Sequence, residues 1–474
     1  MTILKEENVL FWFKKDLRAS DNQAFYEATK YKNILPIYIV NDQIPEKYQL
    51  GSASQWWLHH SLLDLQKSLY DRLNIYKGDP LIIIPKLVKQ YNITNVIFNQ
   101  CYESWNRKIE QKLQKILEKN GVNLIVYNDS LLIHPEQTFK KDGTFYKVFT
   151  PFYKNIIKIL KLSEYKKIPF NKVKFIKDTK NKTTIKSLKL VDKDVDKKLS
   201  KYWNPTQIQA QKQLKKFIKN GLKGYEYNRN IPSVNGTSLL SPYLHFGQIS
   251  IKTVWSQIAA IKAIPTKDKQ CFLKELCWRE FCYNLLYNFE SLHCKNFKSK
   301  FDNFAWKNNK KLLTAWQEGQ TGYPLVDAGM RQLLQTGYMH NRVRMVVASF
   351  LIKNLNISWH QGSLWFLQHL VDADIASNSA NWQWVAGSGA DAAPFFRIFN
   401  PTIQAKKFDP QAEYIKKYVP ELKKLPMKYI FEPSVASEEI LKKANIILGK
   451  NYPFPVVDLK DSRQKALFLY NQIK

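Results

Sequence analysis

Cysteine is scarce in this sequence, and its arrangement excludes a disulfide or zinc framework. The 474 residues contain five Cys, an odd number without a C-x-x-C pair. Three of them, Cys271, Cys277 and Cys282, fall within one expected helix, where they are interpreted as core residues. No centre built from cysteines is expected.

Long apolar runs are also missing. Charges at Lys5, Glu6 and Glu7 leave no apolar region at the N-terminus for a signal peptide. No stretch approaches the roughly 20 apolar residues of a spanning helix. With 45% hydrophobic residues the chain can still bury a large core. The sequence therefore predicts a soluble, cytoplasmic protein without membrane contact.

Arginine is rare, although the chain is strongly basic. Lys and Arg number 73 against 40 acidic residues, a net charge of +33, and only ten of the 73 are Arg. Basic surfaces gain affinity for phosphate backbones by releasing counterions, so a polyanionic partner is expected, with a merely solvated Lys surface as the alternative. Because Arg is a planar bidentate donor, the six Arg between Arg229 and Arg397 mark the more specific positions.

Both common phosphate-binding glycine loops are absent, G-x-G-x-x-G after the first expected strand and G-x-x-x-x-G-K-[ST] anywhere. The first 130 residues nevertheless alternate short apolar runs with amphipathic stretches. This alternation predicts a parallel sheet with crossover helices. Strands are expected at Val9–Phe13, Ile34–Val40, Asn95–Phe98 and Asn123–Tyr127, and helices at Ser54–Leu73 and Asn106–Lys119.

Strand signals nearly vanish after Thr206, and helical spacing follows. We predict a doubly wound, Rossmann-like α/β domain over residues 1–135, a connector over 136–205 and a helical domain over 206–474. Lys140–Ser200 holds 18 Lys and six acidic residues and is interpreted as a solvated linker, with a DNA-binding arm as the alternative. The clearest expected helices of the third part are Gln207–Asn220, Lys267–Tyr287, Pro324–Gln335 and Asn341–Leu355.

The helical part concentrates Trp, amide, Arg and Asp side chains. Glu275 and Arg279 are spaced i,i+4 among apolar residues, so this pair is expected to face a cleft and a polar ligand. Asn341-Arg342 and Arg344 open a helix, a place that favours anions. Asp372 and Asp374 lack a third metal ligand, so capping or pairing with Arg is expected instead.

Familiar catalytic sets are absent. There is no H-E-x-x-H and no G-x-S-x-G, and His340 and His369 are interpreted as packed or surface residues. A site rich in stacking and hydrogen-bonding groups but poor in nucleophiles suits redox chemistry carried by a bound cofactor.

Five segments together carry a resemblance that covers nearly the whole chain. They read VLFWFKKDLRASDN, GTSLLSPYLHFGQIS, ELCWREF, GQTGYPLVDAGMRQLLQTGYMHNRVRM and DADIASNSANWQWVAGSGADAAPFFRIFNP. The sequence resembles the photolyase/cryptochrome family of blue-light flavoproteins, with Lys14 where the family's first turn often has Arg. Within it, Asn378 and Met345 make the chain most similar to class I cyclobutane pyrimidine dimer photolyases.

The resemblance implies an α/β antenna-type domain, a connector and a helical domain that binds FAD. Arg344 and Asp372 would pair beside the flavin ring, and Asn378 would face its N5 atom. Phe272 stands where some relatives carry a stacking Trp. The implied cofactor-binding residues are Tyr225, Thr237, Ser238, Leu239, Leu240, Ser241, Phe272, Arg279, Arg344, Asp372, Ala373, Asp374 and Asn378.

The resemblance also implies repair of cyclobutane pyrimidine dimers in DNA by electron transfer from excited reduced FAD to a flipped dimer. Glu275 and Asn341 would hydrogen-bond the dimer, and Trp382, Trp359 and Trp306 would pass electrons to oxidised flavin. A monomer is expected. The implied DNA-binding residues are Arg229, Glu275, Trp278, Asn341, Arg342, Met345, Trp384, Arg397 and Gln404.

The antenna chromophore stays open between methenyltetrahydrofolate, a deazaflavin and none. Relatives that bind the folate carry an Asn-Glu pair in the stretch where this chain reads YESWNRKIE, with Trp105 and Asn106 near those positions, whereas Cys294-Lys295 is similar to another part of that site. Two other functions are weighed against repair. A cryptochrome-type light receptor would share the flavin site, and a non-enzymatic DNA-binding protein would explain the charge alone. Flavin absorbance and light-dependent repair distinguish the three.

Overall fold

The computed structural model describes residues 5–162, 168 and 173–473. Contacts divide the chain into two compact units, each interrupted in sequence. Unit 1 comprises residues 1–219 and 238–290, and unit 2 comprises residues 220–237 and 291–474. The predicted boundaries at residues 135 and 205 mark the change from sheet to helices, whereas these two units are defined by their internal contacts. The domain boundaries therefore stay predictions.

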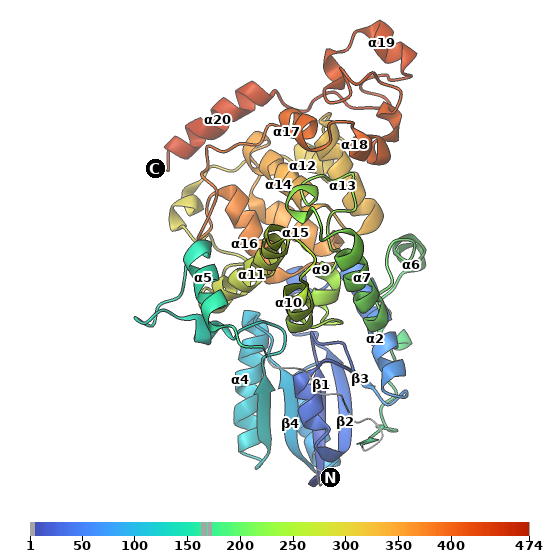
Figure 1. The fold of residues 1–474 in the computed structure, drawn as a ribbon, viewed down its shortest axis with the longest axis vertical. Coiled ribbons are helices and arrows are strands. Elements are labelled where there is room, and N and C mark those ends of the chain that lie inside the picture. The colour runs from blue at the N-terminus through green and yellow to red at the C-terminus, as the bar shows by residue number, and fades with distance from the viewer. Residues whose placement is uncertain (1–4, 163–167, 169–172, 474) are drawn as a thin grey trace. The chain divides into compact units, whose positions relative to one another are not determined.

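Unit 1 contains a parallel sheet whose order is β3-β2-β1-β4-β5, with β6 beside β2 (Figure 1). Because β2 and β4 flank β1 on opposite sides, the chain reverses its winding direction there. The doubly wound class is confirmed. The strands are β1 (Lys5–Phe13), β2 (Tyr31–Val40), β3 (Asn74–Lys77), β4 (Ile93–Asn99), β5 (Asn123–Tyr127) and β6 (Lys174–Phe175).

The central strands β1, β2 and β4 form because most of their apolar residues are buried on both faces of the sheet. Val9 to Phe13 of β1 are all buried, which explains an uninterrupted apolar run instead of alternation. Leu10 and Trp12 pack in one cluster with Phe98 of β4 and Leu113. Each fully buried side chain of this size contributes about 1.5–3 kcal/mol.

Unit 1 also holds ten α-helices among its described residues, and two of them, together with β6, lie in the predicted connector. Thus α5, α6 and β6 give part of the Lys-rich segment regular structure. The helices are α1 (Gln23–Ala28), α2 (Ser52–Ser68), α3 (Pro80–Gln90), α4 (Ser104–Glu118), α5 (Phe149–Ile159), α6 (Lys193–Leu199), α7 (Gln207–Asn220), α9 (Ser241–His245), α10 (Ile251–Ala260) and α11 (Thr266–Asn288).

In its described part, unit 2 is helical apart from one isolated bridge, as predicted. One expected helix is wrong in part, because α14 ends at Ser349 and continues as the π-helix η6 (Phe350–Asn354). The remaining helices are α8 (Tyr225–Asn228), α12 (Lys310–Gln317), α13 (Pro324–Thr336), α14 (Asn341–Ser349), α15 (Trp359–His369), α16 (Ile375–Ala386), α17 (Pro401–Phe408), α18 (Glu413–Tyr418), α19 (Glu438–Lys443) and α20 (Leu459–Asn471).

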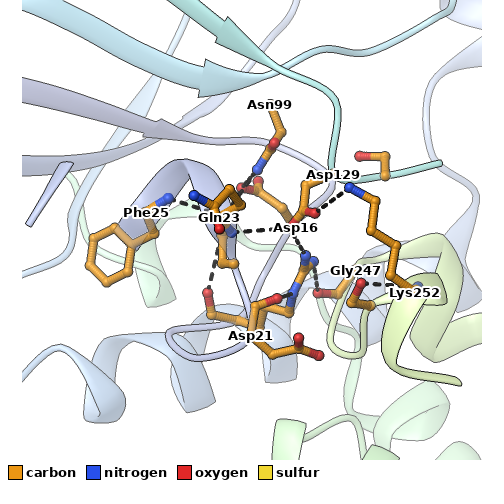
Figure 2. A network of polar contacts seen from close by, with 12 residues as sticks. Asp16, Asp21, Gln23, Phe25, Asn99, Asp129, Gly247 and Lys252 are labelled. Atoms are coloured by element: carbon orange, nitrogen blue, oxygen red, sulfur yellow. Dashed lines mark hydrogen bonds and ion pairs between the residues drawn. The ribbon is translucent and has the colours of Figure 1, made fainter. Parts of the chain in front are cut away.

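The turn after β1 is locked by a buried polar network (Figure 2). The Arg18 guanidinium donates to Asp129 Oδ2 at 2.6 Å and to the Gly247 carbonyl at 2.9 Å. Asn99 donates to Asp16 Oδ2 at 2.7 Å, and Lys252 completes the charge balance at Asp129 Oδ1. The network explains the D-L-R spacing of the first turn as a structural clamp within unit 1.

No described helix combines the length and the apolar character needed to cross a bilayer. In the same described residues, His, Cys, Asp and Glu side chains form no group of three that could hold a metal ion. The five Cys are free thiols. Core packing is confirmed for Cys277 and Cys282 of α11, whereas Cys271 is only half-buried near the start of that helix, so the prediction is wrong in part for it.

Candidate functional site

The N-terminus of α14 gathers positive charge around a buried histidine. His340 caps the helix through Nδ1, which accepts from the Arg342 N–H at 3.2 Å. Its Nε2 is buried and has no hydrogen-bond partner. Burial, and then the guanidinium groups of Arg342, Arg344 and Arg229, lower the pKa of His340 to about 4. The ring is therefore neutral at pH 7, and the helix start lacks the negative charge that its dipole favours.

Arg342 and its neighbours form the outward side of this helix start. The Arg342 guanidinium donates to Asn230 Oδ1 and approaches Met345 Sδ at 3.7 Å. Its carbon centre lies 4.5 Å from the centre of the Phe408 ring. Asn341 is exposed at the first position of the helix. The structure thus brings Asn341, Arg342 and Met345 together on one short segment.

The opposite side of the same turn carries a charged pair. Arg344 binds Asp372 through one nitrogen at 3.0 Å from each carboxylate oxygen and also donates to the Met339 carbonyl. Asp374 caps α16 by accepting from the Ser377 N–H at 2.8 Å. The prediction that these carboxylates pair with Arg or cap a helix is confirmed.

Asn378 is held by a side chain that the sequence analysis missed. Its Nδ2 donates to both the Ser363 hydroxyl, at 2.8 Å, and the Ser363 carbonyl, at 3.1 Å. These bonds join α16 to α15 and fix the orientation of the amide, whose oxygen is left as an acceptor. A serine one turn after Trp359 gave no signal by itself.

The three tryptophans of the expected electron chain are all connected to α15. Trp359 is its first residue and donates from Nε1 to Asn296 Oδ1 at 2.9 Å. A Cβ on Gly362 would lie 2.1 Å from the Trp382 ring, so only glycine lets this indole pack against the helix. Trp306 precedes Lys307, whose N–H donates to Asn356 O just before α15. Sequence spacing gave no sign of this common support.

The loop that contains Arg397 is anchored by a buried lysine. Lys353 of η6 is 1% exposed and donates to the Arg397 carbonyl at 2.8 Å. Burial, and then the Arg397 charge, lower the pKa of Lys353 to about 7. Ser349 accepts from the Phe399 N–H at 3.2 Å. The Arg397 side chain itself is exposed, and Gln404 lies on α17, which begins just after this loop.

Gln383 is the clearest residue that the sequence analysis missed. It is fully buried between Trp382 and Trp384 in the sequence, accepts from the Phe297 N–H and donates to the Leu292 and Lys295 carbonyls. Three bonds to one loop fix the register of α16. Its place between two tryptophans was the feature of the sequence that could have indicated a buried, structural amide.

In unit 1, α11 carries several of the residues that the resemblance implies for the site. Phe272 is buried and packs on Phe217 with ring centres 4.7 Å apart. Trp278 stacks on Phe149, with an interplanar angle of 6°, so one face of the indole is covered by α5. Glu275 is half-buried one turn before Arg279. Phe149, from the predicted connector, is a second missed residue.

Arg279 faces the segment after β5. Its guanidinium donates to the Ser130 carbonyl at 3.0 Å and pairs with Glu280 at 3.3 Å. Glu280 accepts from the Leu132 N–H at 2.8 Å. Burial, opposed by the Arg279 charge, raises the pKa of Glu280 to about 7. These contacts give Arg279 a structural attachment that its spacing to Glu275 did not indicate.

The segment from Thr237 to Ser241 runs from one unit into the other. In unit 2, Thr237 hydrogen-bonds Tyr338, and Tyr225 is buried at the start of α8. In unit 1, Leu239 has a left-handed φ of 53°, and Gln213 donates to the Ser238 carbonyl. Leu240 directly precedes Ser241, the first residue of α9. In unit 2, Ala373 is buried and lies between Asp372 and Asp374 in the sequence.

The stretch considered for an antenna chromophore lies after β4. Trp105 stacks on Tyr48 at 5.6 Å, and Asn106 donates to Glu103 at 2.9 Å. Lys14, at the end of β1, pairs with the buried Glu110. Ligands of open α/β sheets bind where the strand order reverses, which is between β1 and β4 in this sheet. Cys294 belongs to unit 2.

Comparison with known proteins gives matches over almost the whole chain. Residues 9–171 match the family described as DNA photolyase, and residues 272–472 match the FAD binding domain of DNA photolyase. The deoxyribodipyrimidine photo-lyase of Agrobacterium fabrum is 44% identical, covering 99% of each chain. Cryptochrome-2 of Arabidopsis thaliana is 32% identical over 97% of this chain and 78% of its own length.

A solved structure shows the same fold. The crystal structure of a bacterial class III photolyase from Agrobacterium tumefaciens superposes with a TM-score of 0.94 at 42% identity, covering 99% of this chain and 98% of that one. The predicted combination of a parallel-sheet domain and a helical domain is confirmed. The predicted class I is not decided by these matches.

Proposed function

This chain belongs to the photolyase/cryptochrome family, and we propose that it repairs cyclobutane pyrimidine dimers in DNA with the energy of blue light. It is a deoxyribodipyrimidine photo-lyase. The observation that carries this function is full-length identity of 44% with an enzyme of that name. The helical domain that binds FAD in the family is present, as residues 272–472 show.

The donor set around Asp372 fits FAD. It offers a carboxylate fixed by Arg344, the capping carboxylate of Asp374 and the Asn378 amide oxygen. These three acceptors suit the ring N–H groups of a flavin, the Arg344 guanidinium is a donor suited to its carbonyls, and the neutral Asn378 does not itself supply a proton to N5. We propose that Tyr225, Thr237 and the segment Ser238–Ser241 hold the ribityl and phosphate part, with Phe272, Ala373 and Arg279 completing the site.

Reduced FAD, when bound and excited by blue light, supplies the electron that opens the cyclobutane ring and recovers it afterwards. The residues of this chain bind and orient the dimer. We propose that Glu275 and Asn341 hydrogen-bond the thymine edges, where negative charge develops. Such bonds strengthen as the reaction proceeds and so favour ring opening over simple binding. Trp278 and Trp384 would stack on the flipped bases, and Met345 would contact the thymine methyl groups.

The DNA strand is proposed to bind across the N-terminus of α14. Arg229 and Arg342 lie beside the neutral His340, so two guanidinium groups and the positive end of the helix dipole favour a phosphate there. Arg397 projects from the loop held by Lys353, and Gln404 follows on α17. Contacts to phosphates position the DNA strand without reading its base sequence, which suits an enzyme that repairs lesions in any sequence.

Trp306, Trp359 and Trp382 are proposed to pass electrons to oxidised FAD. All three are tied to α15 or to the turn before it. Trp382 and Trp359 are buried, whereas Trp306 is half-buried. An order from half-buried to buried suits a relay that takes electrons from the solvent.

Light-dependent reversal of thymine dimers tests the function. Protein with fully reduced FAD is illuminated with DNA that contains dimers, single-stranded in one series and duplex in the other, and the intact thymines are measured. We expect repair in the light and none in the dark. Binding of dimers without repair would favour the cryptochrome-type receptor, the alternative supported by 32% identity with Cryptochrome-2.

Arg342→Ala tests the DNA interface. We expect weaker binding, with the slope of log affinity against log salt reduced by about one, because one phosphate contact is lost. The repair yield per bound dimer should stay unchanged. Binding titrations at several salt concentrations measure the slope, and Arg331→Ala, which removes a paired Arg elsewhere in unit 2, is the control. An unchanged slope would place Arg342 outside the interface.

The remaining assignments extend this proposal. We propose a cytoplasmic monomer of class I, with domain boundaries at residues 135 and 205. Trp105 and Asn106 leave methenyltetrahydrofolate, a deazaflavin or no antenna chromophore equally compatible with the stretch after β4. Absorption spectra of the purified protein distinguish these three.

A further inference from the structure

Asn356 occupies a strained and buried turn in unit 2. It lies between the π-helix η6 and Ser358, the cap of α15, and has a left-handed φ of 55°. Its exposure is 5%, and its Oδ1 is buried without a hydrogen-bond partner. The N–H groups of Leu355 and Ile357 donate back into η6 and fix the turn on both sides. Left-handed backbone and an unpaired buried oxygen both cost free energy, and such costs concentrate at functional positions.

The two remaining polar groups of Asn356 hold the residues on either side of Trp306. Its Nδ2 donates to the Ala305 carbonyl at 2.9 Å. Its carbonyl accepts from the Lys307 N–H at 2.8 Å. The Trp306 backbone is therefore bound to one residue through both of its neighbours. Side-chain packing adds less definition, because the Trp306 ring is half-buried against Phe304.

The same turn also fixes the next tryptophan. Trp359 follows Asn356 by three residues and opens α15. Its indole is independently held by Asn296, at 2.9 Å. The turn at Asn356 therefore bonds both neighbours of Trp306 and leads directly into Trp359.

We propose that Asn356 is a positioning residue for electron transfer from Trp306 to Trp359, an inference that rests on the proposed role of these tryptophans. Electron transfer between rings weakens steeply with distance, so a small displacement of Trp306 slows the last step of charge separation. Glycine accepts the left-handed φ but has no amide, and aspartate accepts it but cannot donate to Ala305. Asparagine is suited to both requirements.

Transient absorption of the FAD-loaded protein tests the proposal. In Asn356→Gly we expect the first step, electron donation by Trp382, to keep its wild-type rate. The yield of the long-lived tryptophan radical should fall by about threefold or more, because the site becomes too loose. Asn445→Gly is the matched control, since Asn445 also has a left-handed φ, of 60°, in an exposed position. Asn356→Asp tests the lost donor without added backbone freedom.

A second measurement does not depend on FAD. Protein labelled with 5-fluorotryptophan gives a fluorine resonance for Trp306 that Trp306→Phe identifies by its loss. We expect this resonance to shift or broaden in Asn356→Gly and to stay unchanged in Asn445→Gly. A structural role in folding alone would lower the unfolding midpoint without moving this resonance selectively.

The outcomes separate the inference from the function on which it rests. If Trp306→Phe abolishes the long-lived radical and both Asn356 variants retain it, the positioning role is wrong and the tryptophan chain stands. If Trp306→Phe itself has no effect, both the chain and the positioning role are wrong. Loss of the radical in the Asn356 variants with an unmoved Trp306 resonance also contradicts positioning.

Discussion

Trp382→Phe is expected to abolish light-driven reduction of oxidised FAD while repair by chemically reduced enzyme stays near the wild-type level. The indole of Trp382 is 3% exposed and packs against Gly362 and Phe366. Phenylalanine fills most of this volume but is much harder to oxidise than tryptophan. Illumination of the oxidised protein with an external reductant, followed by the flavin spectrum, measures the first effect, and thymine recovery measures the second.

Trp316→Phe is the matched control for this change. Trp316 is equally buried in unit 2, and its ring lies 6.2 Å from that of Trp382, but it has no place in the proposed relay. It should keep photoreduction, after allowance for the hydrogen bond that it loses to the Val347 carbonyl. Equal losses in both variants would mean that packing, and not the indole of Trp382, controls electron transfer. Loss of repair in reduced Trp382→Phe would give that residue a direct part in repair.

Gly247→Ala is expected to have the largest effect on stability. Gly247 has a φ of +69°, and a Cβ there would lie 2.1 Å from the Lys15 carbonyl oxygen. The Arg18 guanidinium binds the Gly247 carbonyl in the network of Figure 2, so a backbone shift also disturbs a buried charge. Left-handed strain and overpacking together amount to roughly 2–5 kcal/mol. Chemical denaturation followed by far-UV circular dichroism measures the change.

Gly121→Ala isolates the contribution of space from that of backbone conformation. Gly121 has nearly the same φ, +67°, but nothing lies within 4 Å of the position of its Cβ. This variant should lose only the left-handed strain, about 1–2 kcal/mol. A loss for Gly247→Ala no greater than for Gly121→Ala would contradict the close packing between the two turns.

Periodicity predicted most of the fold because its signal is local. The apolar runs that predicted β1, β2, β4 and β5 are continuous segments, and α7 was predicted from Gln207 to Asn220 as the structure has it. Short or irregular elements were not predicted from the sequence. β3 has four residues, and the π-helix after Ser349 keeps helical spacing while changing its hydrogen-bond pattern. The pattern of apolar side chains alone does not distinguish the hydrogen bonds of a π-helix from those of an α-helix.

The site residues could not be predicted from local periodicity as the fold was. Arg344, Asp372 and Asn378 were chosen by resemblance, and their residue types already restricted the chemistry to charge pairing and neutral hydrogen bonding. Their partners were not predictable. Lys353, Asn356 and Gln383 donate to backbone carbonyls from 44 to 91 residues away. Ser363 accepts from the Asn378 amide, 15 residues away.

The sequence by itself determined the fold class, the family and the kinds of side chain at the site. The scarcity of arginine was informative because a planar donor among many lysines marks a specific contact. Only the tertiary structure decided which backbone groups those side chains hold. It showed Arg18 as a clamp, Arg342 beside a neutral histidine, and Trp306 bound through Asn356. Hydrogen bonds depend on distance and direction in space, and neither is encoded in local sequence pattern.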